Sequence, residues 1–104
     1  MAPLYVGTLA EKRKRKIVRE LKGGKVSIGT YVLTMPASEN NQLDIVPAFQ
    51  LLQPFFKKHE PEIVGIALGK TDAIELVSRI TLDAVEATGE PYIVDYLRKK
   101  QKSI

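Results

Sequence analysis

Cysteine is absent from this sequence of 104 residues, and histidine occurs once, as His59. Without cysteine the chain can form no disulfide, zinc–thiolate site or thiol nucleophile. No segment approaches the roughly 18 consecutive apolar residues that indicate a membrane span. The first apolar run also precedes the first basic run, whereas a secretory signal has the opposite order. We therefore expect a cytoplasmic protein with no membrane partner.

The sequence also lacks a clear catalytic or metal-binding constellation. His59 follows two lysines at the end of an expected helix, where a cation suits the helix dipole. The neighbouring Glu60 is poorly placed to orient this imidazole as a base. No cluster of metal ligands stands out. We predict no catalytic residue, no metal and no cofactor, and a non-enzymatic function is favoured.

Length and composition fit one small globular domain that spans residues 1–104, with a basic C-terminal tail at 98–104. The apolar content of 44% and the charged content of 27% are ordinary for a folded protein. A chain of this length buries about two-thirds of its unfolded surface, which is enough for one hydrophobic core.

The net charge of +4 is unevenly distributed along the chain. Residues 11–25 carry eight basic and two acidic side chains, whereas residues 26–97 carry four basic and ten acidic ones. Residues 98–104 add four basic side chains. Two basic ends therefore flank an acidic body, which indicates a polyanionic partner or association between unlike surfaces.

Strand and helix patterns alternate along the chain. Strands are expected at 4–7, 25–35, 62–69 and 91–94, and helices at about 9–22, 45–58 and 72–88. This β-α-β-α-β-α-β order predicts an α/β fold with a mixed or mostly parallel sheet of about four strands and three helices.

The helix at 9–22 has a rival, a β-hairpin formed by residues 15–21 and 25–34. The helix is preferred because Thr8 and Glu11 have capping-box spacing and Gly23 can adopt the left-handed conformation that closes a helix.

The turn "GKTD" at 69–72 raises the question of phosphate binding. A Walker A loop has four residues between its first glycine and Gly-Lys-Ser/Thr, whereas only three separate Gly65 from Gly69. Those three residues belong to an apolar strand rather than to a flexible loop of inward-facing N–H groups. We interpret the turn as a strand-to-helix junction in which Asp72 caps the helix.

A second interpretation of this turn is a weaker anion-binding site. If the second and third strands are parallel, the loop at 36–42 and the turn at 69–72 lie at the same sheet edge, where α/β proteins bind ligands. The candidate ligand-binding residues are Ser38, Asn40, Asn41, Lys70 and Thr71. The simpler interpretation, a surface turn at Asn40–Asn41, is preferred.

The expected helix at 9–22 is strongly basic, and lysine and arginine bind phosphates without reading base sequence. The alternative is a solvated helix surface. No aromatic residue falls within 6–30, so the aromatic interleaving typical of single-strand binders is missing. The candidate nucleic-acid-binding residues are Lys12, Arg13, Arg15, Lys16, Arg19 and Lys22, with support from Arg98, Lys99 and Lys100.

The expected helix at 45–58 is apolar on more than one side. Such a helix either lies between a sheet and another helix or contacts a second chain. We favour homodimerisation or a protein partner, with Phe49, Phe55 and Phe56 as candidate interface residues.

Three segments, "YVLTMPASENNQLDIVPAFQLL", "EIVGIALGKTDAIELV" and "YIVDYL", together resemble a family of small α/β proteins of unknown function from Gram-positive bacteria. The resemblance covers roughly residues 31–97. It implies a bacterial α/β protein, and it carries no activity, cofactor or catalytic residue to this chain.

These patterns predict a non-enzymatic accessory or regulatory protein that binds a polyanion, such as nucleic acid, through its basic ends. One alternative is a protein or enzyme that binds a small anionic ligand between the 36–42 loop and the 69–72 turn. The other is an interaction or dimerisation module.

Overall fold

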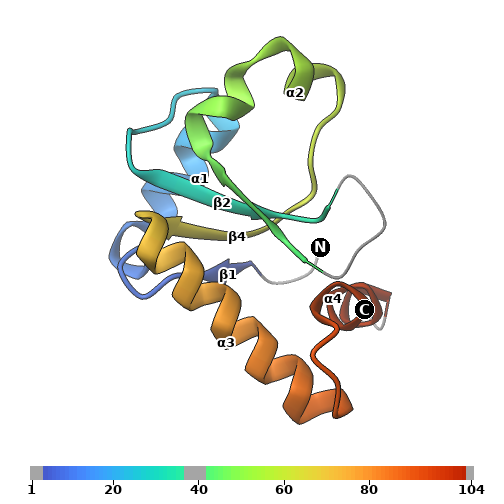
Figure 1. The fold of residues 1–104 in the computed structure, drawn as a ribbon. Coiled ribbons are helices and arrows are strands. Elements are labelled where there is room, and N and C mark those ends of the chain that lie inside the picture. The colour runs from blue at the N-terminus through green and yellow to red at the C-terminus, as the bar shows by residue number, and fades with distance from the viewer. Residues whose placement is uncertain (1–3, 37–41, 103–104) are drawn as a thin grey trace.

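A four-stranded mixed sheet forms the centre of the structure, a computed structural model that describes residues 4–36 and 42–102 (Figure 1). In their order across the sheet the strands are β1 (Tyr5–Val6), β4 (Ile63–Leu68), β2 (Thr30–Thr34) and β3 (Asp44–Pro47). β1 runs parallel to β4, whereas β2 runs antiparallel to both β4 and β3. The predicted α/β class and mixed sheet of about four strands are confirmed.

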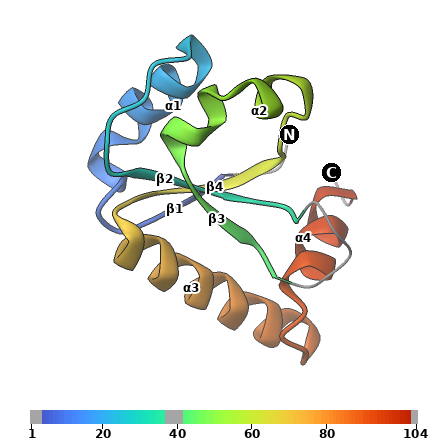
Figure 2. The same cartoon turned by 45° about the horizontal axis from the view of Figure 1, so that its top comes forward.

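Helices cover both faces of the sheet (Figure 2). One layer, here the α1/η2 layer, contains the 3₁₀ helix η1 (Glu11–Arg13), the helix α1 (Lys14–Gly23) and the 3₁₀ helix η2 (Ala48–Leu52). The opposite α3/α4 layer contains α3 (Lys70–Thr88) and α4 (Ile93–Lys102). The short helix α2 (Pro54–Lys58) follows η2 and lies away from the sheet. Within the described ranges, no helix is both long and apolar enough to cross a membrane.

Each face of the sheet has its own hydrophobic core, because successive strand side chains point to opposite faces. Beneath the α1/η2 layer, Val32 and Ile66 pack with Ile17 and Ala48. Beneath the α3/α4 layer, the buried cluster includes Leu33, Ala67, Leu76, Ile80 and Val94. β4 is therefore buried on both faces, as its continuous apolar sequence predicts.

Residues 14–23 form a helix, so the hairpin alternative is wrong. The helix ends one residue later than predicted, because Gly24 rather than Gly23 has the left-handed conformation (φ 72°). The capping box does not form. Instead, Thr8 Oγ1 accepts a hydrogen bond from the Arg79 guanidinium (3.4 Å), and a 3₁₀ turn precedes α1.

The predicted helix at 45–58 is wrong at its start, because residues 44–47 form the edge strand β3. Ile45 and Val46 are β-branched and fit a pleated, half-buried surface. Pro47 is tolerated there because an edge strand can spare one backbone N–H. Helical structure begins only with η2, and Pro54 then occupies the first turn of α2.

The predicted strand at 91–94 is also wrong, because Ile93 begins α4. Ile93, Val94 and Leu97 are buried at helical spacing, and the Tyr96 N–H donates to the Tyr92 carbonyl (3.0 Å). A short apolar run does not distinguish a strand from a buried helical turn. The fold therefore has four α-helices in its described part rather than three, and residues 98–102 extend α4.

The strand predicted at 25–35 is shortened to Thr30–Thr34. The Thr30 N–H donates to the Ser27 carbonyl (3.3 Å), and Gly29 has a φ of 97°. This turn leaves Ile28 95% exposed. Because β2 runs antiparallel to β4, the loop after β2 and the turn after β4 lie at opposite ends of the strands and not at the same end.

Candidate nucleic-acid interface

The basic residues of α1 form a ridge on the side of the helix that faces away from the sheet. At about 100° per residue, Arg15, Arg19 and Lys22 lie opposite the sheet-facing Ile17 and Leu21. Ile17 is 2% exposed, whereas the three cations are exposed. Lys12 in η1 is also exposed and precedes them in the sequence. We define the basic ridge as Lys12, Arg15, Arg19 and Lys22.

The acidic side chain of α1, Glu20, is directed away from this ridge. The Glu20 carboxylate lies on the flank of α1 and accepts a hydrogen bond from Ser27 Oγ (3.1 Å). Among the residues that the structure describes, no ridge cation has a hydrogen-bond or ion-pair partner. Arg15 and Arg19 are like charges four residues apart, an arrangement that costs a few tenths of a kcal/mol. The ridge therefore holds repelling charges that an anionic partner would neutralise.

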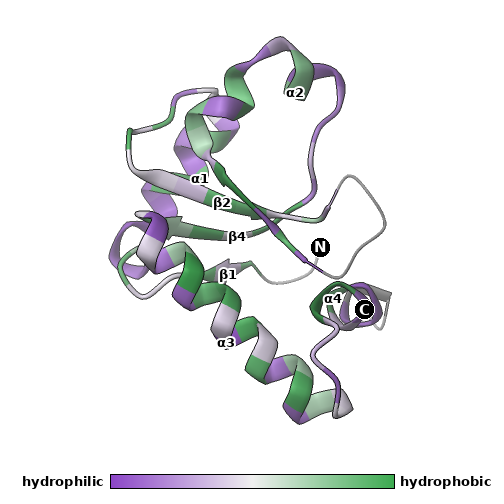
Figure 3. Ribbon diagram, in the orientation of Figure 1, coloured by the Kyte–Doolittle hydropathy of each residue, from purple (hydrophilic) through white to green (hydrophobic). Residues whose placement is uncertain are grey.

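The ridge has a length suited to a phosphate backbone. With a rise of about 1.5 Å per residue, Arg15 and Lys22 are about 10 Å apart along the helix axis. That distance corresponds to about three phosphates of one DNA strand, at about 3.4 Å per phosphate. Arg13 and Lys16 are exposed beside the ridge and add positive charge. In Figure 3 the hydrophilic colour marks much of α1, and it also appears on α2, on the segment that follows α2 and on parts of α3 and α4.

The C-terminal candidates lie on the other side of the sheet from the ridge. Arg98, Lys99 and Lys100 belong to α4, which packs in the α3/α4 layer. The Lys100 ammonium lies 5.2 Å from the centre of the Tyr5 ring and 5.7 Å from that of Tyr96, within the range of cation–π attraction. The structure therefore does not join the two predicted basic ends into one surface.

Tyr5 connects β1 with both helices of the α3/α4 layer. Its hydroxyl donates to Asp83 Oδ2 (3.0 Å) and accepts from Lys100 Nζ (3.5 Å). Burial raises the pKa of the Tyr5 hydroxyl, and hydrogen bonds with Tyr96 and Asp83 raise it further. These contacts give Lys100 a structural role.

The Gly69–Asp72 turn is closed by a carboxylate of the chain itself. Asp72 is 2% exposed, and its two oxygens accept hydrogen bonds from the N–H groups of Leu68 (2.9 Å) and Leu9 (3.3 Å). Gly7 leaves room for this carboxylate, because a Cβ at that position would overlap Asp72 Oδ2. The prediction that Asp72 caps its own helix is wrong. It instead joins the segment that follows β1 to the last residue of β4.

The two segments that were predicted to form a ligand cleft, residues 36–42 and 69–72, follow opposite ends of the sheet. Lys70 and Thr71 are exposed just beyond the Leu68 end of β4. The loop at 36–42 follows β2, whose last residue, Thr34, pairs with Ile63 at the other end of β4. Ser38, Asn40 and Asn41 lie outside the described residues.

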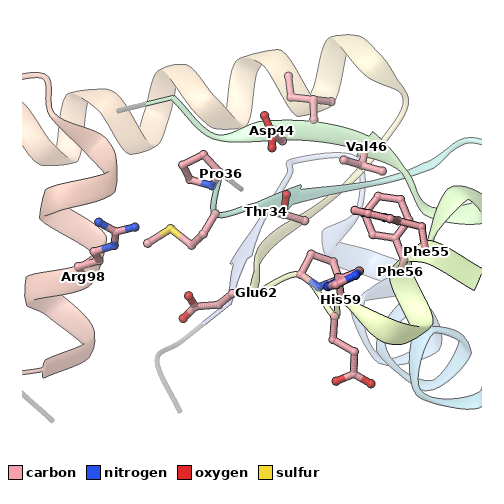
Figure 4. A pocket seen from close by; sticks show the side chains of 13 residues that line it. Thr34, Pro36, Asp44, Val46, Phe55, Phe56, His59, Glu62 and Arg98 are labelled. Atoms are coloured by element: carbon pink, nitrogen blue, oxygen red, sulfur yellow. The ribbon is translucent and has the colours of Figure 1, made fainter. Parts of the chain in front are cut away.

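An open pocket of about 770 Å³ lies between α2 and the ends of β2 and β3 (Figure 4). Phe55, Phe56 and His59 form one side of it. Its charged lining mixes both signs: Asp44, Glu60, Glu62 and Arg98. Three carboxylates against one guanidinium do not favour an anionic ligand. The described residues contain no group of three or more potential metal ligands.

The candidate interface residues Phe49 and Phe55 are 50% and 61% exposed, and Phe56 is half-buried. The sequence analysis missed Leu52, which is 42% exposed. Its three-residue spacing from Phe49 is the available signal, since residues i and i+3 share one side of a 3₁₀ helix.

The basic ridge gathers several charges of one sign without partners among the described residues, whereas the pocket mixes both signs. The N–H groups near the Gly69–Asp72 turn are already bound by the Asp72 carboxylate. Comparison of the chain with family models, curated proteins and solved structures found no match, so function is inferred from this geometry.

Proposed function

We propose that the protein is a non-enzymatic accessory or regulatory protein that binds nucleic acid through the basic ridge of α1. The observation that carries this proposal is the ridge itself. Three exposed cations follow one side of α1, the exposed Lys12 of η1 precedes them, and the acidic Glu20 of α1 is directed to a different partner.

The chemistry of the ridge favours contact with the backbone over contact with bases. Lysine and arginine on phosphates position a protein on nucleic acid without reading sequence. Four such contacts predict a slope of log affinity against log salt of about −4 on duplex DNA and about −3 on a single strand. The binding is therefore expected to be strongly salt-dependent and tolerant of sequence.

A charge-matched pair of variants tests this proposal. The ridge variant replaces Arg15, Arg19 and Lys22 with Ala. The control variant replaces Lys70, Arg79 and Lys99 with Ala, which removes the same number of positive charges elsewhere. By fluorescence anisotropy with labelled DNA at low salt, we expect the ridge variant to lose about tenfold or more in affinity. The control variant should keep its affinity within about twofold.

Equal losses in both variants would mean that binding follows net charge and not the ridge, which contradicts the proposal. So would wild-type protein that binds neither duplex nor single-stranded DNA at low salt. Circular dichroism of each variant establishes that the substitutions leave the helix content unchanged.

A further inference from the structure

An apolar aromatic patch lies on the segment that follows the edge strand β3. We define it as Phe49, Leu52 and Phe55, which are 50%, 42% and 61% exposed. Within η2, Ala48 and Leu51 face the sheet and join its core, so Phe49 and Leu52 point outward. Phe55 belongs to α2, the next element after η2. Several large apolar side chains exposed on consecutive elements indicate a contact surface.

Phe55 is held in place although it is mostly exposed. Its ring meets Phe56 edge-on, with centroids 5.2 Å apart and planes at 86°, and meets the His59 ring at 4.9 Å. Figure 4 shows the three side chains gathered at one side of the pocket. A ring fixed by two neighbours loses little conformational entropy when a flat partner stacks on it.

The patch and the basic ridge lie on the same side of the molecule. Ile17 and Leu21 of α1 share one core cluster with Ala48 and Leu51 of η2, all beneath the same layer (Figure 2). The outward sides of α1 and η2 therefore both face away from the same face of the sheet. The exposed Lys57 and Lys58 in the last turn of α2 add two cations next to Phe55. Residues 6–30 contain no aromatic ring, but the fold places Phe49 and Phe55 on the same side of the sheet as the basic ridge.

We propose that this combined surface binds single-stranded DNA or RNA, with phosphates on the basic ridge and unpaired bases stacked on Phe49 and Phe55. The inference rests on the proposed function and narrows it to one class of nucleic acid. Duplex DNA offers phosphates but encloses its base faces, whereas a single strand offers both. A positively charged groove combined with aromatic stacking platforms is the common design of proteins that bind single strands without sequence preference. The positive charge beside the patch disfavours a second copy of this basic surface as its occupant.

The test compares oligothymidylate and oligouridylate of about 20 nucleotides with a duplex of the same length, since a single-strand site covers about 4–16 nucleotides. We expect wild-type protein to bind both single strands more tightly than the duplex. Phe49→Leu and Phe55→Leu keep an apolar side chain and remove the ring, and each should weaken single-strand binding about fivefold or more. Duplex affinity should not change. Tyr92→Leu is the matched control, because Tyr92 is 51% exposed and precedes α4 in the opposite layer.

A second readout uses the absence of tryptophan from the chain. Phe55→Trp introduces one fluorophore at the patch, and stacking with a base should quench its emission on addition of oligothymidylate but not of duplex. Tyr92→Trp should show no quenching with either. Quenching that is equal at both positions would overturn the proposal.

Three outcomes distinguish a failure of the single-strand proposal from a failure of the proposed function. If the ridge variant loses binding but both Phe→Leu variants bind single strands like wild type, this inference fails and the proposed function stands. If wild-type protein binds no nucleic acid, both fail. If sedimentation shows a dimer that Phe55→Leu dissociates while strand binding is unchanged, the patch is a homodimer interface and the proposal is overturned.

Discussion

The two helical layers use their polar side chains differently. In the α3/α4 layer, the Asp72 carboxylate holds the N–H groups of Leu9 and Leu68, and Tyr5 joins Asp83 to Lys100. In the α1/η2 layer, the ridge cations point to solvent and have no partner among the described residues. The Asp72 and Tyr5 networks of the first layer stabilise the fold, whereas the ridge cations of the second layer are available for binding.

The outer surfaces of the layers also differ in kind. The outer side of α3 exposes Ile74 and Leu82, and the acidic Glu75 and Glu86 flank them. The exposed Arg79 lies four residues after Glu75, so this surface mixes charges of both signs and has no basic ridge. The overall charge of +4 conceals this division, and only the placement of each charge on a layer locates the basic ridge.

The largest expected effect is the loss of the Asp72 carboxylate. Asp72→Ala leaves two backbone N–H groups without their acceptor in a buried site, which should lower the free energy of unfolding by about 3 kcal/mol. Urea denaturation measures this change. Glu75→Ala, an exposed position on the same helix, should stay within about 0.5 kcal/mol. A similar small effect for Asp72→Ala would remove the structural role that we assign to this layer.

A smaller effect is expected at Tyr5. Tyr5→Phe removes the hydrogen bond to Asp83 and should lower the free energy of unfolding at neutral pH by about 1 kcal/mol. Because the folded protein raises the pKa of Tyr5, wild-type stability should be retained below the ordinary tyrosine pKa of about 10 and fall as pH rises above it.

Tyr5→Phe should therefore lose less stability than wild type between neutral pH and about pH 11. The exposed Tyr92 supplies the control, and Tyr92→Phe should follow the wild-type profile. Identical pH profiles for the two variants would contradict the placement of the Tyr5 hydroxyl in a buried network.

The smallest expected effect on stability is that of the ridge. Replacing Arg15, Arg19 and Lys22 with Ala removes exposed, mutually repelling charges and keeps helix propensity high. The free energy of unfolding should change by less than about 0.5 kcal/mol. A loss of more than about 1 kcal/mol would mean that these side chains stabilise α1, and the contrast between the layers would disappear.

Long periodic segments could be predicted from the sequence, and short ones could not. The helix predicted at 72–88 and the buried strand at 62–69 agree with α3 and β4, because each pattern is long enough to decide its type. The segment at 44–47 and the one at 91–94 are four residues each, and tertiary packing reversed both assignments. Strand direction could not be predicted either, because no local signal in the sequence shows that β2 runs antiparallel to β4.

Part of the candidate site could likewise be predicted from the sequence, and part could not. The basic ridge could be read from the spacing of Arg15, Arg19 and Lys22, because helical periodicity alone places them together. The neighbouring Phe49 and Phe55 are more than 25 residues away in sequence, and only the packing of η2 beside α1 brings the two segments into one layer. The separation of Lys100 from the ridge likewise depends on where α4 docks.

The most direct test of the central claim is the salt dependence of DNA binding, measured for wild-type protein, the ridge variant and the charge-matched control. We predict a log–log slope of about −4 for wild type and control on duplex DNA, and a slope smaller by about three units in the ridge variant. Slopes that are the same in all three proteins would contradict the claim that nucleic acid binds along α1.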